Sequence, residues 1–282
     1  MTIVFDGKTF AAQKEVGLRI KIFGLKAKGI TPHLVSILIG SNPASKLYVT
    51  LKQKAAQRVG ATLEVYEIGV RKDADYIIRL IKFLNEKEDV HGIMVQLPLP
   101  PRLQKYTSEI VNSIASQKDV DGLRDNSKYL HPTSMAILQV MEEAKRQTQT
   151  TDYYAPRIVV VGSTGMVGKP LMKELEKLKY ERKKVIKDFS VVGVNSQIKN
   201  LKAVTKKADI LISATGVAGL ITEDMVKRGG LIALDVGAPY GDFNYEQVAK
   251  KSKFITPVPG GVGPVTIACL LENLVAAAYN TN

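Results

Sequence analysis

VVVGSTGMVGKP, residues 159–170, combines an apolar run with three spaced glycines. The run RIVVVG is typical of a buried strand and GKPLMKELEKLK of a helix, so the glycines fall in the turn between the two. Gly162, Gly165 and Gly168 allow a tight turn and let the backbone approach a pyrophosphate at the helix N-terminus. The spacing is not the strict Gly-x-Gly-x-x-Gly, so a purely structural turn is the alternative.

Strand-like and helix-like stretches alternate on both sides of this turn. Two such runs predict an α/β protein with two units, each built on a parallel sheet, and the best boundary lies near residues 146–156. An insertion, KYERKKVIKD, lengthens the connection to the strand that follows the turn. Strands are predicted at 33–40, 61–69, 91–100, 157–162, 189–194, 209–216 and 229–237, and helices at 45–60, 73–88, 133–147, 168–179 and 200–208.

Length and composition indicate an ordinary globular protein of two domains, with 282 residues of which 45% are hydrophobic and 24% charged. The single cysteine, Cys269, excludes an intrachain disulfide and a multi-cysteine metal site, and its apolar neighbours favour a buried thiol. The N-terminus shows no basic segment followed by an apolar run, and no apolar stretch is long enough to cross a bilayer. We therefore expect a cytoplasmic protein that binds no membrane.

The charge balance is strongly basic, with 40 Lys and Arg against 27 Asp and Glu, a formal net charge of +13. The lysines are spread along the chain, and no RNA-binding signature, zinc finger or helix-turn-helix accompanies them. A solvated basic surface, or a field that attracts phosphates and polycarboxylates, explains the excess better than nucleic acid does.

Tyr48 and Lys52 lie one helical turn apart in SNPASKLYVTLKQKAAQRVG, residues 41–60, and would point into the same space. A Tyr-x-x-x-Lys pair also serves short-chain dehydrogenases, but there the glycine-rich turn precedes the pair, whereas here it follows in the other predicted unit. On the same helix, Ser45 is expected to cap the start and Lys54 to be solvated.

Four further stretches carry candidate site residues. VQLPLP (95–100) places Gln96 near the carboxyl end of a strand, where α/β sheets bind ligands, and KDVDG (118–122) places Asp121 in a nearby loop. ITPVPGGVGPVT (255–266) suits a rigid loop close to a flat ligand. FSVVGVNSQIKN (189–200) ends its strand without the carboxylate that binds the ribose of NAD, which favours NADP.

In this order, the stretches resemble those of the FolD family, bifunctional methylenetetrahydrofolate dehydrogenase/methenyltetrahydrofolate cyclohydrolase, over essentially the whole chain. DGK near the start, PASKLYVTLK at 43–52, ADILISATG and DVG match as well. The resemblance implies NAD(P)-dependent oxidation of 5,10-methylenetetrahydrofolate to 5,10-methenyltetrahydrofolate, followed by hydrolysis to 10-formyltetrahydrofolate. It also implies a catalytic domain at 1–146, completed by a C-terminal helix at 263–282, and a Rossmann-like domain at 147–262.

The resemblance further assigns roles to residues of this sequence. Lys52 is the catalytic residue of the hydrolysis, Gln96 hydrogen-bonds it, Tyr48 stacks on the folate, and Asp121 holds the pterin. No metal site is implied, and His33, His91 and His131 match no catalytic position, so they are expected to be surface or packing residues. The folate-site residues are Tyr48, Lys52, Val95, Gln96, Leu97, Asp121, Pro259, Gly260 and Gly261. The residues implied for NADP, or NAD, are Gly162, Ser163, Thr164, Gly168, Ser196, Thr215, Gly216 and Ala238.

Two departures from the family pattern qualify this expectation. Where many members have Gly-Arg-Ser, this chain has Gly162-Ser163-Thr164, so the arginine that could hold a 2′-phosphate is missing, and Lys199 or Lys202 would have to replace it. The segment after KDVDG is shortened and keeps only part of a Pro-Cys-Thr-Pro turn, at Thr133.

The resemblance also implies a homodimer that binds the folate substrate and no nucleic acid. Three alternatives stay open: a cyclohydrolase without dehydrogenase activity, a NAD-preferring relative, and a non-catalytic basic protein that binds nucleic acid on the same fold.

Overall fold

The computed structural model describes residues 1–149, 155–181 and 189–280, which form two compact units. The three-stranded unit comprises Ala11–Pro132 and Ile267–Asn282, and the six-stranded unit comprises Met1–Phe10 and Thr133–Thr266. All strand pairs in both sheets are parallel, so the predicted α/β class is confirmed. The insertion KYERKKVIKD falls mostly outside the described residues, as does part of the stretch near 146–156 in which a boundary was expected.

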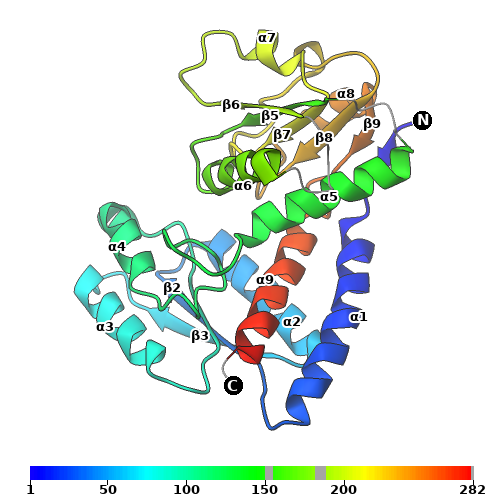
Figure 1. The fold of residues 1–282 in the computed structure, drawn as a ribbon. Coiled ribbons are helices and arrows are strands. Elements are labelled where there is room, and N and C mark those ends of the chain that lie inside the picture. The colour runs from blue at the N-terminus through cyan, green and yellow to red at the C-terminus, as the bar shows by residue number, and fades with distance from the viewer. Residues whose placement is uncertain (150–154, 182–188, 281–282) are drawn as a thin grey trace. The chain divides into compact units, whose positions relative to one another are not determined.

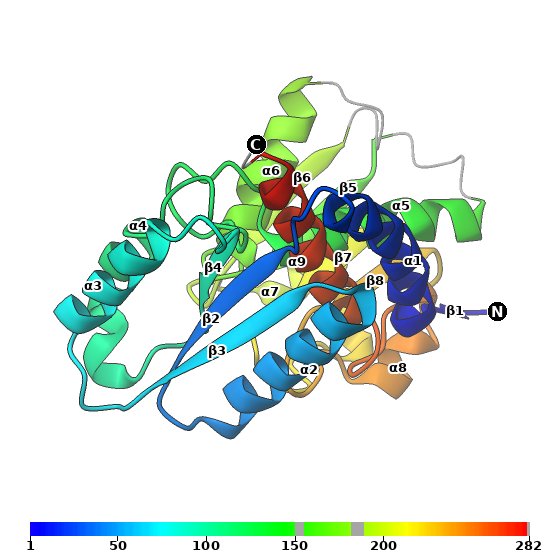
Figure 2. The same cartoon turned by 90° about the horizontal axis from the view of Figure 1, so that it is seen from below.

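The smaller sheet has the order β3-β2-β4, with β2 (His33–Ile39) in the centre, β3 (Thr62–Ile68) and β4 (Gly92–Val95). Alternate residues of β2 feed two separate apolar clusters, one on each face of the sheet, which is why its sequence is almost continuously apolar. The helices α1 (Gly7–Lys26), α2 (Pro43–Val59) and α9 (Val262–Tyr279) cover one face, and α3 (Ala74–Asn85) and α4 (Thr107–Asn112) the other, with η1 (Pro101–Tyr106) before α4 (Figure 2).

The larger sheet has the order β1-β9-β8-β7-β5-β6. Within this unit, α5 (Pro132–Thr148) and α6 (Gly168–Glu181) lie on one face of the sheet, and α7 (Leu201–Thr205) and α8 (Tyr245–Ala249) on the other (Figure 1). The short helix η2 (Glu223–Met225) follows β7. The strands are β1 (Ile3–Val4), β5 (Arg157–Val161), β6 (Ser190–Val194), β7 (Ile210–Ser213), β8 (Leu231–Asp235) and β9 (Ser252–Ile255).

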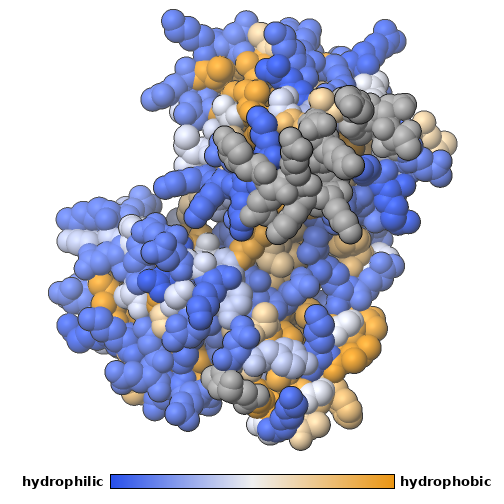
Figure 3. Space-filling model, in the orientation of Figure 1, coloured by the Kyte–Doolittle hydropathy of each residue, from blue (hydrophilic) through white to orange (hydrophobic). Residues whose placement is uncertain are grey.

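The C-terminal helix α9 belongs largely to the three-stranded unit, as expected. The expectation that no apolar stretch is long enough to cross a bilayer was wrong, because α9 is apolar and long enough by length and composition. Its Leu270, Leu271 and Leu274 are nevertheless buried in the core with α1 and α2. The amine of Lys14 on α1 lies 3.0 Å from the carboxylate of Glu272, which ties α9 to α1. In the face shown by Figure 3, hydrophilic side chains cover most of the surface, with apolar side chains in small groups.

Seven elements of the fold were not predicted from the sequence: β1, α1, η1, α4, η2, α8 and β9. The two-residue strand β1 pairs with β9, so residues 1–10 group with the six-stranded unit, and α5 groups with it too. The sequence-based limits, 1–146 and 147–262, assign both segments differently from this contact-based division and stay a prediction about the domains.

Candidate active site

The helix that carries Tyr48 and Lys52 begins at the carboxyl end of β2. Asn42 caps it, because the side-chain oxygen of Asn42 accepts a hydrogen bond of 3.0 Å from the backbone N–H of Ser45, and Pro43 opens the first turn. The expectation that Ser45 caps the helix was wrong, since Ser45 lies within the first turn and is buried. The cap sets where α2 starts and therefore which side chains face the sheet.

The amine of Lys52 points back to the end of β4. Its Nζ donates to Oε1 of Gln96 at 3.0 Å and lies 3.7 Å from Sδ of Met94. The side-chain amide of Gln96 is itself oriented, since its Nε2 donates to the carbonyl of Leu97 at 2.9 Å. The expected hydrogen bond between Lys52 and Gln96 is therefore present.

Burial changes the acid–base properties of this pair. Desolvation lowers the pKa of Lys52 below its ordinary value, while the carboxylate of Asp121 opposes this shift. Desolvation also raises the pKa of Tyr48, which is half-buried on the same helix. Lys54 is exposed, as expected. A lysine with a lowered pKa can release and take up a proton closer to neutral pH than a solvated one can.

Asp121 lies in a loop that its neighbour Asp119 organises. The carboxylate of Asp119 accepts hydrogen bonds from the backbone N–H groups of Leu123 and Arg124, at 3.3 and 3.1 Å. Burial raises the pKa of Asp119 to about 6, and the charge of Asp121 adds to this. The sequence analysis did not identify Asp119, although its place in the KDVDG stretch was a signal.

The chain returns beside Asp121 at residues 129–131. A side chain on Gly122 would meet the backbone N of His131 at 2.7 Å and the carbonyl of Tyr129 at 2.8 Å, so only glycine fits at this position, where φ is +63°. Asn273 on α9 joins the two segments, because its Nδ2 donates to the carbonyl of Val120 at 2.8 Å and to that of Leu130 at 2.9 Å. The positions next to Asp121 and His131 are thus held side by side.

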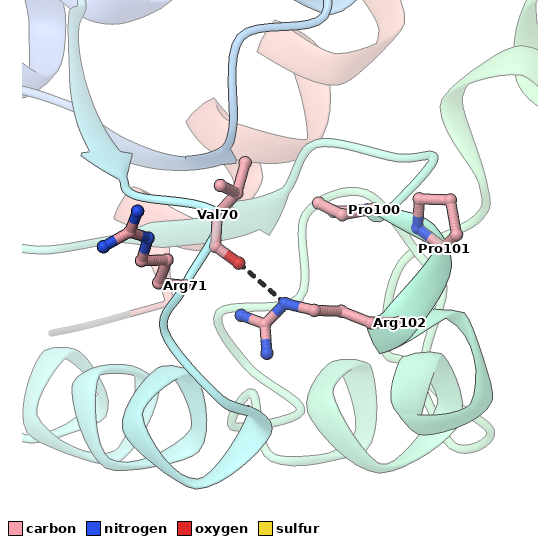
Figure 4. A pocket seen from close by; sticks show the side chains of 5 residues that line it. All are labelled: Val70, Arg71, Pro100, Pro101 and Arg102. Carbon is pink, nitrogen blue, oxygen red and sulfur yellow. Dashed lines mark hydrogen bonds between the residues drawn. The ribbon is translucent and has the colours of Figure 1, made fainter.

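A shallow surface pocket of about 570 Å³ lies at the same edge of the smaller sheet (Figure 4). Its floor includes Val70 and Pro100, which follow β3 and β4, and both side chains lie against Gly40 after β2. Arg102 donates to the carbonyl of Val70 at 2.7 Å, so one of the two arginines that line the pocket is engaged by the backbone.

In the six-stranded unit, the glycine-rich turn leads from β5 into α6. Gly162 adopts φ +84°, and a side chain there would lie 2.5 Å from the carbonyl of Ala214. A side chain on Gly168 would lie 2.1 Å from the carbonyl of Gly162, so the turn closes tightly on the helix start. Ser163 sits beside Gly193 of the neighbouring strand and Thr164 is exposed. The turn therefore fits the close backbone approach that a dinucleotide requires.

Two buried aspartates shape the next loops of this unit. Asp242 accepts hydrogen bonds from Oγ of Ser213 at 2.7 Å and from the N–H and Oγ1 of Thr215, at 2.6 and 2.8 Å. Asp235 accepts from the backbone N–H groups of Gly237, Asp242 and Phe243 at 2.9–3.0 Å, and its burial raises its pKa. Gly216 and Ala238 are exposed next to these loops. Neither aspartate was predicted as a site residue, although Asp235 lies in the quoted DVG stretch, because the role of a buried carboxylate that holds a loop does not show in residue spacing.

The loop after β6 presents Ser196, which is exposed. Lys202, one of the two lysines considered for a 2′-phosphate, has its amine 2.6 Å from the carboxylate of Asp224. Lys199 is exposed, and among the described residues it forms no ion pair. Lys199 is therefore the better placed of the two to meet an added phosphate.

The loop 257–261 packs tightly within the six-stranded unit. A side chain on Gly7, the first residue of α1, would lie 1.8 Å from the carbonyl of Gly261, and one on Gly261 would lie 2.5 Å from that of Pro257. Gly260 adopts φ +104° and Pro259 is exposed. The predicted folate residues Pro259, Gly260 and Gly261 thus belong to this unit, whereas Tyr48, Lys52, Val95, Gln96, Leu97 and Asp121 belong to the three-stranded unit.

The remaining titratable candidates serve the structure. Cys269 is buried, and desolvation raises its pKa to about 12, which confirms the prediction of a structural thiol. The backbone N–H of His33 donates to Nδ1 of His91 at 3.2 Å, and His91 is buried. In the part of the chain that the structure describes, no group of three or more His, Cys, Asp or Glu residues could hold a metal ion.

Comparison with known proteins finds a matching family model for each part of the chain. Residues 5–121 match the model of the tetrahydrofolate dehydrogenase/cyclohydrolase catalytic domain, and residues 131–282 match that of the NAD(P)-binding domain. The chain is 36% identical over 296 residues to the bifunctional protein FolD of Nautilia profundicola, covering 99% of this chain and 98% of that protein.

Solved structures agree with these matches. The bifunctional enzyme FolD from Campylobacter jejuni superposes with a TM-score of 0.88 at 35% identity, covering 99% of both chains. The methylenetetrahydrofolate dehydrogenase-cyclohydrolase of Trypanosoma brucei, complexed with NADP cofactor and inhibitor, superposes with a TM-score of 0.86 at 29% identity, covering 99% of this chain and 98% of that one.

Proposed function

Because the chain belongs to the tetrahydrofolate dehydrogenase/cyclohydrolase family, we propose that it catalyses two consecutive reactions of one-carbon folate metabolism. The first oxidises 5,10-methylenetetrahydrofolate to 5,10-methenyltetrahydrofolate with NAD(P), and the second hydrolyses the product to 10-formyltetrahydrofolate. The observation that supports this most directly is the partly buried Lys52, which has a lowered pKa and is held by Gln96 at the carboxyl edge of the smaller sheet.

For the hydrolysis, we propose that Lys52 acts as the general base. Water attacks the cationic methenyl carbon, and an uncharged amine at Lys52 takes a proton from that water. The bond between this carbon and N5 then breaks as N5 gains a proton, so that one proton of the water ends on N5 and the other is released. A solvated lysine would be almost fully charged at neutral pH, so the desolvation seen here favours the reactive form.

Substrate binding follows from the neighbouring groups. The carboxylate of Asp121 can accept two parallel hydrogen bonds from the 2-amino group and ring N–H of the pterin. Tyr48 offers an aromatic face for stacking. We propose that Lys52, Val95, Gln96 and Leu97 of the three-stranded unit line the folate site. Pro259, Gly260 and Gly261, which were also predicted to line it, lie in the six-stranded unit.

We propose NADP as the preferred cofactor, whose nicotinamide accepts a hydride from the methylene carbon when bound. Gly162, Ser163, Thr164 and Gly168 would hold the pyrophosphate against the start of α6, where amide groups favour an anion. Asn195 and Ser196 follow the strand β6 and no carboxylate stands there, and Lys199 can balance a 2′-phosphate. Thr215, Gly216 and Ala238 would contact the nicotinamide half.

The +13 net charge favours approach of both anionic ligands, NADP and the glutamate tail of folate. We further propose that the protein acts as a homodimer in the cytoplasm.

A matched set of assays tests the function. Wild type, Lys52→Met and Lys54→Met would be compared for oxidation of methylenetetrahydrofolate with NADP or NAD, and for hydrolysis of methenyltetrahydrofolate followed by its near-ultraviolet absorbance. We expect Lys52→Met to lose hydrolysis while it still binds folate, and Lys54→Met, changed at an exposed lysine of the same helix, to match wild type. A wild-type protein that catalyses neither reaction would overturn the proposal.

A further inference from the structure

His131 lies next to the proposed folate site, although the sequence analysis assigned it a surface or packing role. Aligning the partial turn on Thr133 puts His131 where the family pattern has the first proline of Pro-Cys-Thr-Pro, so this chain has an ionisable side chain where that pattern has none. The imidazole is only 8% exposed. A buried imidazole at such a place needs a physical role or a partner.

The backbone fixes its position relative to Asp121. Residues 129–131 pack against Gly122, the residue after Asp121, and Asn273 binds the carbonyls of Val120 and Leu130. These contacts hold the residues on both sides of Asp121 next to residues 129–131.

One nitrogen of the imidazole lacks a hydrogen-bond partner in the described part of the chain. Nδ1 of His131 is buried and has no hydrogen-bond partner among the described residues. A polar group that is buried and unpaired destabilises the folded state, and a hydrogen-bond partner supplied from outside the chain would relieve this cost.

The charges that act on His131 come from two other segments of the same unit. Desolvation and the ammonium of Lys52 on α2 lower the pKa of His131, and the carboxylate of Asp121 in the loop after β4 raises it. The net shift is downward, so the imidazole is uncharged at neutral pH and gains its proton only in acid. Asp119, which also faces Asp121, titrates at a pKa of about 6 and must be distinguished from it.

We propose that His131 is a positioning residue of the folate site: its uncharged imidazole leaves the Asp121 carboxylate to the pterin, and its imidazolium competes with the pterin for that carboxylate. This rests on the proposed function, because it takes Asp121 as the pterin acceptor. It places the acid limit of folate binding in a residue that the family pattern does not supply.

Binding of a reduced folate that cannot cyclise in acid, 5-methyltetrahydrofolate, tests the proposal when it is measured by calorimetry from about pH 8 down to the lowest pH at which the protein stays folded. We expect wild-type affinity to fall by roughly tenfold toward the acid end, as for a neighbouring charge that shifts an equilibrium by one pKa unit. His131→Gln should bind with a much flatter pH dependence, because it cannot become charged. His91→Gln is the matched control, since His91 is also buried and has a lowered pKa, but its charged neighbours are His33, Lys118 and Asp89.

A second readout guards against a purely structural effect. With three histidines in the chain, the His131 ring signals can be assigned in nitrogen-detected NMR by comparison with the two variants. Adding the folate should lower the pKa read from the His131 signals, because the pterin draws on the same carboxylate, and should leave the His91 signals unchanged.

The outcomes separate the two claims. If wild type and His131→Gln bind with the same pH dependence, the inference is wrong and the acid limit belongs to Asp119 or the ligand. If wild type fails to bind any reduced folate at neutral pH, the proposed function itself fails.

Discussion

The hydrogen bond from Lys52 to Gln96 predicts how the pH dependence of hydrolysis would respond to one added charge. Gln96→Glu replaces the neutral acceptor, 3.0 Å from the amine of Lys52, with a carboxylate of nearly the same shape. An opposite charge at this distance raises the pKa of a lysine by about 1–3 units. At neutral pH the uncharged fraction of Lys52, and with it the hydrolysis rate, should fall by roughly 10–10³-fold.

The direction of the effect is what identifies the role of Lys52. Because Lys52 with a raised pKa keeps its proton up to a higher pH, the rate of the Gln96→Glu variant should recover as the pH rises. Its pH–rate profile should therefore move to higher pH. Gln96→Met removes the hydrogen bond without adding charge, and should lower the rate without moving the profile upward. The assay is the loss of methenyltetrahydrofolate absorbance across the pH range, corrected for the uncatalysed reaction in the same buffers.

A superposable profile for wild type and Gln96→Glu would refute this reasoning. It would mean that the protonation state of Lys52 does not limit the hydrolysis, and that Lys52 acts only as a fixed contact.

Three further predictions concern residues outside the Lys52–Gln96 pair. Asp242→Ala leaves the hydroxyl of Ser213 and two donors of Thr215 unsatisfied, so it should lower the free energy of unfolding by about 2–3 kcal/mol in a urea titration and weaken NADP binding; unchanged values for both would count against a role in holding this loop. Gly168→Ala forces a Cβ against the carbonyl of Gly162, so we expect about 1–3 kcal/mol of destabilisation and weaker NADP binding. Gly263→Ala is the control, because no atom lies within 4 Å of the added Cβ, and it should cause neither effect. Native Cys269 should resist iodoacetamide at pH 8, where a pKa of about 12 leaves about one thiol in ten thousand ionised, and should react on unfolding; rapid labelling of the native protein, followed by mass spectrometry, would contradict its burial.

Much of the fold was predictable because the apolar periodicity reports on buried parallel strands. The runs at 33–40 and 157–162 are apolar on both faces, and both became strands in the interior of their sheets. The strand β1 was not predictable, because two residues form no pattern and its pairing with β9 joins positions about 250 residues apart. Local sequence cannot carry such a long-range contact.

The candidate site likewise contains some residues that could be predicted from the sequence and others that could not. Lys52 and Gln96 could be identified because one follows Tyr48 by a helical turn and the other ends a strand, and the structure brings their side chains into contact. Asp242 could not, because its importance comes from burial and from donors that it meets only after folding. Asp119 and Asp235 lie in the quoted KDVDG and DVG stretches, but the backbone donors that they hold also exist only after folding. His131 was not predicted as a site residue for a related reason. Lys52 is far from it in the sequence, and the chain must turn back for Asp121 and His131 to act on each other.

The way the two units share the chain has a consequence for synthesis on the ribosome. The three-stranded unit needs Ile267–Asn282, and the six-stranded unit pairs its edge strand Ile3–Val4 with Phe254–Ile255. The six-stranded unit is therefore incomplete until Phe254–Ile255 have been translated, and the three-stranded unit until α9 has been. A nascent chain must keep its first strand unpaired until Phe254–Ile255 have been made, and a chain that stopped before Val262 would lack the helix that fills the core of the three-stranded unit.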